Sequence, residues 1–600
     1  MILVFGGTTE GRKAVEALEE AGSRYFYSTR GDGQALDLVN GVHLKGDMRL
    51  NDMAAFCHDH DIRLLIDAAH PFAEALHENL ISLARQNHLP LIRYDRIYPP
   101  HTDDIIWCDD YQDAICQLES QGIERLLALT GVNTIAKLRG YWERHECWFR
   151  ILNRPQSQAL AQDEHFPEEH LVYYESDDTA DLIQRVHPDA ILTKESGQSG
   201  GFTEKVEAAR HYGLPVFVVK RPPYPPYSIP SSDVQVVCVN GPHGLRRAVE
   251  KWLPEFYPLH SGLTTGTCAT AAAIAATLRL LRLLRGETPE EVPVVLPNGE
   301  TINVGVTYGD GFAAVWKEGG DDPDVTDGLE VRACVARLPI THQPQVEILG
   351  GEGVGIFTLP GFDYPPGSPA INKVPRQMLT DNLSPFGVPL QVTISVPKGA
   401  ETALRTFNPR LGIEGGISII GVSGIVKPFS EEAFIDSIRK CMEVAKASGS
   451  PRVVINSGAK SERFVKAIYP SLPRQAFVEY GNYIGETLKM AVELGIAQVT
   501  MGVMLGKAVK LAAGQLDTHS RKGTMDKAFI KKMLEEAGCH TDISQLTLAR
   551  DLWNIIPADK TKRFCHVVIS HCRQQCAPIL DSKRLKILLI GENGEIYDGE

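Results

Sequence analysis

The chain has 600 residues, 43% of them hydrophobic and 23% charged, which is enough apolar material for several globular domains and excludes disorder, collagen and coiled coil as the main class. Its net charge of −14 argues against broad binding to nucleic acid. The longest apolar stretch, residues 269–284, is interrupted by Arg279 and Arg282 and is too short to span a bilayer. The first residues lack the features of a secretory signal, so we expect a cytoplasmic protein that does not contact a membrane.

The twelve cysteines do not have the regular spacing of a disulfide framework, so most are expected to be reduced thiols. Cys565, Cys572 and Cys576 stand close together, with two histidines between them. Their spacing fits no zinc or iron–sulfur pattern, so packed thiols are favoured over a metal site and no resident metal is expected.

Residues 1–255 repeat a short apolar strand, a polar loop and an amphipathic helix, which is typical of an α/β fold with parallel strands. Ile2–Phe5 and Leu64–Asp67 are expected in a first sheet. Leu126–Leu129, Ala190–Thr193 and Val216–Val219 are expected in a second. This half therefore predicts two Rossmann-like parallel-sheet domains that face one another, over about residues 1–120 and 121–255.

The character of the sequence changes at a linker, residues 256–261. Residues 262–428 are rich in Gly, Pro, Val and Thr, with a hairpin signal at Pro297-Asn298-Gly299, and predict an α+β domain. Over residues 429–600 helical patterns alternate with short strands again, which predicts a final α/β domain.

The first strand runs directly into a glycine-rich segment that opens a helix. Its candidate cofactor-binding residues are Gly6, Gly7, Thr8, Thr9 and Gly11. Glycines let backbone N–H groups approach a pyrophosphate at a helix N-terminus, although Thr8 replaces the middle glycine of the usual pattern. A tight turn without a ligand is the alternative.

Two further residues stand where the next strands end. Arg30 follows the second strand, where an arginine favours the 2′-phosphate of NADPH. An ordinary solvated surface charge is an equally good interpretation of this residue. His70, in the segment 67–72 after a later strand, is a candidate contact for cofactor or substrate, although a loop histidine is more often a bystander.

In the second sheet, the segment 193–202 again follows a strand and precedes a helix. It contains Lys194 and Ser196 with Gly200 and Gly201, a combination that suits an anion. A flexible glycine-rich turn is the alternative.

Three blocks together, 6–12, 67–72 and 194–201, resemble the precorrin-6A reductases of cobalamin biosynthesis, and the resemblance covers residues 1–250. It implies hydride transfer from NADPH or NADH to carbon 19 of the corrinoid ring, with a proton arriving at carbon 18. Lys194 is our candidate catalytic residue, and solvent is the alternative proton source.

Thr264, Thr265 and Thr267 precede an Ala-rich helix, where their hydroxyls could bind a substrate carboxylate or simply cap the helix. The following acidic segment, residues 319–328, lacks the spacing of a calcium-binding loop and is interpreted as an acidic turn.

The most basic stretch of the second half, residues 502–522, follows a strand. Lys507 and Arg521 are expected to bind an acidic substrate, and Asp517 and His519 are candidate catalytic residues that steer a proton. Lys510 and Lys522 could bind the same substrate. The alternatives are that the Lys510 side chain is simply solvated and that His519 is a helix-end residue.

Blocks at 264–268, 319–326, 408–413, 421–428 and 506–520 look like the cobalt-precorrin-5B C(1)-methyltransferases, over residues 260–600. The resemblance implies S-adenosylmethionine as methyl donor, and Gly481, Gly485, Gly502 and Gly506 are our candidates for its pocket. Asp327 stands where that family is expected to have His or Asn, and residues 456–458 stand where Thr-Thr-Gly is expected. Alignment and desolvation of the reactants should supply most of the rate.

The two resemblances imply consecutive reactions, so the sequence predicts a bifunctional, anaerobic-pathway enzyme that methylates cobalt-precorrin-5B and reduces the product, cobalt-precorrin-6A. The alternatives are a nicotinamide oxidoreductase of the first half alone, a non-catalytic cobalt-corrinoid carrier, or a reductase of metal-free precorrin-6A with a degenerate methyltransferase. Expected partners are the cobalt corrinoid and no nucleic acid. Homo-oligomers and association with other corrin-pathway enzymes stay open.

Overall fold

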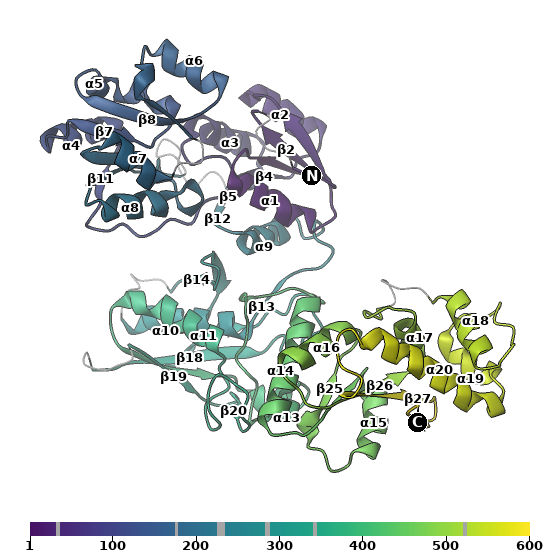
Figure 1. Ribbon diagram of the computed structural model, residues 1–600. Coiled ribbons are helices and arrows are strands. Elements are labelled where there is room, and N and C mark those ends of the chain that lie inside the picture. The colour runs from purple at the N-terminus through teal and green to yellow at the C-terminus, as the bar shows by residue number, and fades with distance from the viewer. Residues whose placement is uncertain are drawn as a thin grey trace. The chain divides into compact units, whose positions relative to one another are not determined.

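The computed structural model describes residues 1–31, 36–174, 178–224, 235–281, 288–339, 345–519 and 525–599 (Figure 1). The chain forms two compact units. Unit 1 consists of Met1–His260 and Pro293–Asn303, and unit 2 consists of Ser261–Val292 and Val304–Glu600. The predicted substrate contacts Arg521 and Lys522 lie outside the described residues.

The first sheet of unit 1 has the strand order β12-β5-β4-β1-β2-β3, and every neighbouring pair is parallel. Its strands are β1 (Ile2–Phe5), β2 (Tyr25–Thr29), β3 (Gly41–Lys45), β4 (Leu64–Asp67), β5 (Leu91–Tyr94) and β12 (Val236–Val239). Its helices are α1 (Thr9–Glu19), α2 (Leu50–Asp59), α3 (Glu74–Gln86) and α9 (Pro242–Trp252). The central strands are buried on both faces, which is why they appear in the sequence as short apolar runs.

The second sheet of unit 1 has the order β6-β11-β10-β7-β8-β9 and is also parallel throughout. Its strands are β6 (Ile106–Cys108), β7 (Arg125–Ala128), β8 (Glu146–Leu152), β9 (Leu171–Tyr174), β10 (Ala190–Lys194) and β11 (Val216–Val219). Its helices are α4 (Tyr111–Ser120), α5 (Arg139–Trp142), α6 (Pro155–Asp163), α7 (Thr179–Val186) and α8 (Phe202–His211). The prediction of two Rossmann-like parallel sheets is confirmed.

The division of unit 1 at residues 120 and 121 does not match the path of the chain. β6, expected in the first sub-unit, pairs with β11 of the second sheet, and β12, expected in the second, returns to pair with β5 of the first. Helix α9 then packs against α1. The reason is that β5 would otherwise be an edge strand with unpaired backbone N–H and C=O groups. The strand that pairs with them, β12, comes from the far end of the unit.

Unit 2 begins with a mixed sheet of order β16-β17-β18-β21-β19. Its strands are β16 (Thr307–Tyr308), β17 (Ala313–Trp316), β18 (Glu330–Arg337), β19 (Val346–Gly350) and β21 (Leu390–Ser395), with α10 (Thr265–Leu280) and α11 (Lys373–Leu383) packed on it. The short elements around it are β13 (Gly262–Leu263), β20 (Ile356–Phe357), α12 (Gly399–Ala403), α13 (Asn408–Leu411), β22 (Ile413–Glu414) and β23 (Ile425–Val426). Residues 265–277 of α10 are buried all round, since small alanine side chains let the sheet and α11 approach the helix closely.

The predicted hairpin around Pro297-Asn298-Gly299 is confirmed as β14 (Glu291–Val295) and β15 (Thr301–Gly305). Its tip, Pro293–Asn303, belongs to unit 1. There the buried carboxylate of Glu300 accepts a hydrogen bond from Gly244 N in the first turn of α9. Thr301 N donates to Asn240 Oδ1 at 2.7 Å.

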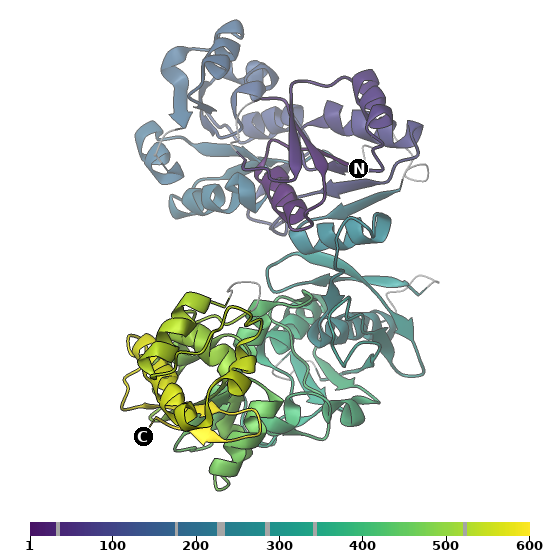
Figure 2. The same ribbon diagram turned by 90° about the vertical axis from the view of Figure 1, so that its right-hand side faces the viewer.

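Unit 2 ends in a sheet of order β25-β24-β26-β27-β28, parallel except for the last pair. Its strands are β24 (Val453–Asn456), β25 (Phe477–Glu479), β26 (Val499–Met504), β27 (Leu585–Ile590) and β28 (Ile596–Tyr597). Its helices are α14 (Glu431–Ala447), α15 (Ala459–Ile468), α16 (Ile484–Glu493), α17 (Leu505–Ala512), α18 (Lys527–Glu536), α19 (Leu552–Ile555) and α20 (Ala558–Cys576). Helices α17 and α18 pack against α20, in the yellow part of Figures 1 and 2. The second half is thus an α+β region followed by an α/β region, as predicted.

The cysteine cluster lies on α20 within the core of this last region. Cys565, Cys572 and Cys576 are buried, and burial raises the pKa of all three thiols. The Cys572 thiol donates to Ala508 O at 3.3 Å. Among the described residues, no three His, Cys, Asp or Glu side chains are grouped as metal ligands would be, and no helix is long and apolar enough to span a membrane.

Candidate functional sites

The glycine-rich loop of unit 1 lies at the point where the strand connections of the first sheet diverge. From β1 the chain passes to β2 on one side, and β4 is added later on the other, so the loops that follow β1 and β4 are neighbours. Thr8 Oγ1 joins them, donating to Ala68 O at 2.8 Å and accepting from Gly11 N at 3.1 Å. Open α/β sheets bind their ligands at this position, outside the carboxyl ends of the strands.

Tyr27 explains why this loop is built from glycines. A Cβ on Gly6 would overlap the Tyr27 ring, and one on Gly11 would lie 2.9 Å from the Tyr27 hydroxyl. That hydroxyl accepts a hydrogen bond from Gly7 N at 2.9 Å. Gly7 itself has φ of +97° and no atom within 4 Å of its Cβ position, so there is open space beside its Cα.

Thr8 accounts for the departure from the usual glycine pattern. It is the N-cap of α1, and Thr9 is the first residue of that helix. A capping hydroxyl satisfies a backbone N–H of the first helical turn, which a glycine at this position would leave without that partner. Thr8 is therefore compatible with a cofactor loop.

A buried ion pair, which the sequence analysis missed, joins the two predicted loops of unit 1. Glu10, in the first turn of α1, pairs with Arg96 Nε at 3.0 Å. Arg96 Nη1 also donates to Ser196 O at 2.6 Å, and Ser199 Oγ donates to the Glu10 carboxylate. The loops at residues 6–12 and 194–201 thus meet, although nearly two hundred residues separate them.

The second sheet brings Lys194 to its own point of divergence, between β7 and β10. The loop after β7, Thr130-Gly131, lies at the same point, and the sequence analysis did not single it out. Its signal in the sequence is an apolar strand followed by Thr and Gly. Lys194 Nζ lies 5.2 Å from the centre of the Phe72 ring. Burial, and next the ammonium of Lys205, lower the pKa of Lys194 to about 8.

The glycine-rich loop beside Lys194 is folded on itself. Ser196 Oγ and Lys205 Nζ both donate to Gly200 O, at 3.2 and 2.9 Å. A Cβ on Gly200 would overlap Ser196, and Gly201 has φ of +65°. Burial, followed by Arg150, lowers the pKa of Lys205 to about 8. The loop thus sits among several positive charges, which suits an anionic ligand.

His70 stays neutral at physiological pH. Burial, followed by Arg96 and Lys194, lowers its pKa to about 3. Phe72 N donates to His70 Nδ1 at 3.2 Å, so the ring proton is on Nε2. His77 supports this loop, bonding to His70 O at 3.0 Å and to the fully buried Asp67 at 2.6 Å.

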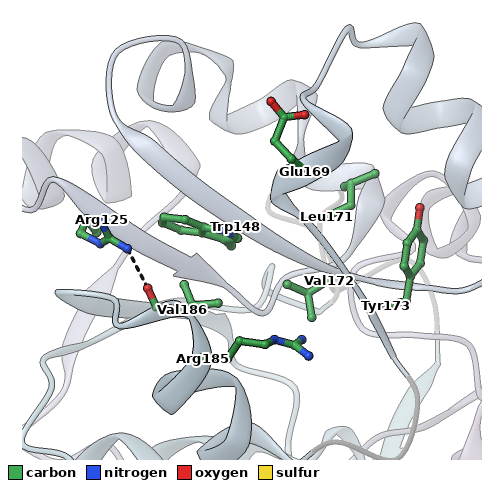
Figure 3. A pocket seen from close by; sticks show the side chains of 8 residues that line it. All are labelled: Arg125, Trp148, Glu169, Leu171, Val172, Tyr173, Arg185 and Val186. Carbon is green, nitrogen blue, oxygen red and sulfur yellow. Dashed lines mark hydrogen bonds between the residues drawn. The ribbon is translucent and has the colours of Figure 1, made fainter.

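Arg30 is exposed immediately after β2, next to the strand that carries the glycine loop. A pocket of about 440 Å³ lies elsewhere, at the amino edge of the second sheet (Figure 3). There Arg125 Nη2 donates to Val186 O at 2.9 Å and its guanidinium lies 5.0 Å from the Trp148 ring. No predicted site residue lines this pocket.

In unit 2 the three threonines before the Ala-rich helix are buried. Thr264 Oγ1 caps α10 by accepting from Thr267 N at 3.3 Å, and Thr267 Oγ1 donates to Gly424 O at 2.6 Å. Thr265 Oγ1 accepts from Ile420 N at 2.8 Å. Thr264 caps the helix as the alternative expects, whereas Thr265 and Thr267 hold the loop at 418–424. A contact of these hydroxyls with a substrate carboxylate stays a prediction.

The acidic segment at 319–328 is a turn closed by its own side chains. Asp324 pairs with the buried Lys317 at 2.6 Å and accepts from Thr326 N at 2.8 Å. Asp327 Oδ1 accepts from Gly319 N at 2.6 Å. An amide or imidazole could fill this last role, so the aspartate is compatible with the turn.

The predicted residues of the last region converge at the carboxyl edge of its sheet. Lys507 Nζ donates to Gly481 O, and Gly485 N donates to Leu516 O at 3.1 Å. Tyr483 and Asp517 form a β-bridge. Burial lowers the pKa of Lys507, although nearby Glu479 acts in the opposite direction.

The other predicted residues here have different surroundings. A Cβ on Gly502 would meet Val465 at 2.5 Å, which is a packing reason for glycine, whereas Gly506 has open space around its Cβ position. His519 N donates to Asp517 Oδ1 at 3.1 Å. The roles of all these residues stay predictions.

Comparison with known proteins assigns both halves of the chain. The model of the precorrin-6x reductase family CbiJ/CobK matches residues 1–239, and the CbiD family model matches residues 254–428. A cobalt-precorrin-5B C(1)-methyltransferase of Prosthecochloris aestuarii is 42% identical over 348 residues, which cover 55% of this chain and 94% of the relative. The enzyme of the same name from Geobacillus sp. strain WCH70 is 40% identical over 52% of this chain and 88% of its own length.

Two solved structures are also similar. The cobalamin biosynthesis protein cbiD from Archaeoglobus fulgidus has 30% identity and a TM-score of 0.26, over 44% of this chain and 83% of that one. A CobK precorrin-6A reductase has 21% identity and a TM-score of 0.34, over 42% of this chain and 96% of that one. The chain therefore belongs to the cobalt-precorrin-5B C(1)-methyltransferase family through its second half, and its first half is a domain of the precorrin-6x reductase family.

Proposed function

We propose that the chain carries out two consecutive steps of cobalamin biosynthesis. Unit 2 methylates cobalt-precorrin-5B at carbon 1 with S-adenosylmethionine, and unit 1 reduces the resulting cobalt-precorrin-6A to cobalt-precorrin-6B with NADPH. The observation that carries the proposal is the presence of both families in one chain. The cobalt is part of the substrate.

The glycine loop of unit 1 suits a nicotinamide dinucleotide. Gly7 leaves open space at the N-terminus of α1, and the negative charge of Glu10 in that first turn is balanced by Arg96. Arg30 stands at the end of the neighbouring strand, where it can meet a 2′-phosphate. When bound, the reduced nicotinamide supplies the hydride.

Lys194 is the residue we propose as proton donor to carbon 18. Its pKa of about 8 leaves it mostly protonated at pH 7 while making the proton easier to release than from an ordinary lysine. His70 has a pKa of about 3, so its imidazole is neutral at that pH and cannot act as an imidazolium acid. It can instead donate a hydrogen bond from Nε2 to a ligand. Lys205 and its neighbours attract the acidic corrinoid.

In unit 2 the electron-rich carbon 1 of the ring attacks the methyl group, forming a C–C bond as the S–CH₃ bond breaks. S-adenosylmethionine supplies that methyl as a sulfonium, and S-adenosylhomocysteine leaves. The protein aligns the two reactants and keeps water away. Lys507, partly buried at the edge of the sheet, offers a positive charge to a carboxylate.

An anaerobic assay tests both activities. Purified protein is given cobalt-precorrin-5B and S-adenosylmethionine, with and without NADPH or NADH, and products are followed by mass. We expect the gain of one methyl group without nicotinamide and of two further hydrogens with it. Corrinoid that binds and stays unchanged would instead indicate a carrier.

We also propose that the protein works in the cytoplasm, where its cofactors are made and its twelve free cysteines stay reduced. Replacing Arg30 with alanine tests the choice of nicotinamide. The KM for NADPH should rise while that for NADH stays unchanged. An equal change for both would exclude a contact with the 2′-phosphate.

A further inference from the structure

Glu479 is the last residue of β25, and it was not among the residues singled out in the sequence. It is partly buried, and its carboxylate lies over the loop that follows β24. Oε1 is 3.3 Å from the position that a Cβ on Gly458 would take. The charge of Glu479 opposes the lowering of the pKa of nearby Lys507 by burial, but within the described part of the chain these two side chains form no ion pair at 4 Å or less.

The strands around Glu479 define where a ligand would lie. From β24 the chain goes through α15 to β25 on one side, and then through α16 to β26 on the other side of β24. The connections therefore diverge at the carboxyl end of β24. The carboxyl ends of β24, β25 and β26 share this edge, with Gly458 in the loop after β24, Glu479 at the end of β25 and Gly506 in the first turn of α17.

The loop after β24 is held in a conformation that only glycine adopts easily. Gly458 has φ of +141°, and its N–H donates to Asn456 Oδ1 at 3.1 Å. Ser461 Oγ accepts from Ser457 N at 3.0 Å and donates to Gly458 O at 2.9 Å. The hydrogen-bonded loop presents the backbone of Gly458 opposite the carboxylate of Glu479.

In dinucleotide-binding sheets of this kind, an acidic residue about 20 positions after the first glycine loop, at the end of the second strand, accepts hydrogen bonds from ribose hydroxyls. Glu479 has the same relation to Gly458. A carboxylate with free lone pairs is the natural acceptor for a vicinal diol. Gly506, with open space around it, lies on the other side of the same point of divergence.

We propose that Glu479 binds the two ribose hydroxyls of the adenosyl methyl donor, with the nucleoside lying across Gly458. This rests on the proposed function and adds a named donor-binding residue to unit 2. The charge of Glu479 acts to raise the pKa of nearby Lys507 against the effect of burial, but the ammonium of Lys507 donates its hydrogen bond to Gly481 O. The carboxylate is thus left for a ligand.

The test is calorimetric titration of the full chain with S-adenosylhomocysteine and with its 2′-deoxyribose analogue. Glu479→Gln keeps the size of the side chain and removes its charge. The matched control is Glu493→Gln at the C-terminal end of α16, away from this edge, where the carboxylate pairs with Arg439 at 2.7 Å. Thermal unfolding checks that each variant is folded.

We expect the unmodified chain to prefer the ribose ligand by about tenfold or more, since a hydrogen bond to a charged group is worth that much. Glu479→Gln should bind S-adenosylhomocysteine about tenfold more weakly and lose the preference, while Glu493→Gln behaves like the unmodified chain. Unchanged affinity and preference in Glu479→Gln would overturn this inference alone. If that variant does not fold, absence of any ribose preference in the unmodified chain overturns it. An unmodified chain that binds no S-adenosylhomocysteine would overturn the proposed methyltransferase function as well.

Discussion

The ion pair between Glu10 and Arg96 should be the most sensitive point of unit 1. The two side chains are 4% and 6% exposed, and Arg96 carries the contact from the first sheet to the loop of the second. Replacing Arg96 with methionine, or Glu10 with glutamine, leaves the remaining partner buried without its counter-charge. Breaking a buried pair in this way costs about 3–5 kcal/mol.

The exposed pair Arg63 and Glu255 of the same unit provides the control. Its side chains are 51% and 58% exposed, so Arg63→Met should cost no more than about 1 kcal/mol. For a domain of this size, each kcal/mol lowers the midpoint of thermal unfolding by about 2–4 °C. The transition of unit 1 should therefore fall by roughly 6–20 °C in either buried variant.

Differential scanning calorimetry of the full chain measures these shifts, and the double variant Glu10→Gln with Arg96→Met decides their cause. Because the double variant buries no unpaired charge, it should be more stable than either single variant, with a coupling energy above about 2 kcal/mol. Additive losses, with coupling below about 0.5 kcal/mol, would refute the argument.

The pH dependence of the pair has a defined sign. Burial would raise the pKa of Glu10, but Arg96 and the hydroxyl of Ser199 outweigh it and the pKa is lowered from 4.5. The stabilisation is therefore fully present above pH 4.5 and is lost as the pH falls through the lower value of the folded protein. The difference in stability between the unmodified chain and Glu10→Gln should shrink in that acidic range.

Three further changes test other parts of the molecule. Lys194→Met should slow reduction by about 100-fold or more in stopped-flow assays. In the unmodified protein the rate of reduction should fall as the pH rises through about 8, because Lys194 loses its proton. A variant that reduces the substrate at the full rate would contradict this role. Glu300→Ala removes the acceptor of Gly244 N at the start of α9 and should cost unit 1 about 1–2 kcal/mol in urea unfolding, whereas an unchanged midpoint excludes a capping role. Gly6→Ala places a methyl group against the Tyr27 ring and should weaken NADPH binding, measured by fluorescence titration, without changing S-adenosylhomocysteine binding in unit 2.

The sequence alone determined the sheets and the loops that carry chemistry. Strands buried on both faces must be continuously apolar, so β1, β4, β7, β10 and β11 were recognisable. A loop that bends at positive φ or packs against a ring needs glycine, so the segments at 6–11 and 196–201 were recognisable too. The motif resemblances, which family comparison supports, added the activities.

The tertiary structure decided which of those residues meet and what their surroundings are. The Arg96 partner of Glu10 lies 86 positions away, and β12, which follows all the strands of the second sheet, returns to pair with β5. The neutral state of His70 depends first on its burial and then on nearby positive charges, Arg96 and Lys194, that come from the two sheets. Residue type and spacing report only local conformation, whereas burial and electrostatic fields depend on segments brought together by folding. Glu479 could therefore be recognised as a candidate ligand contact only when its carboxylate was seen over Gly458.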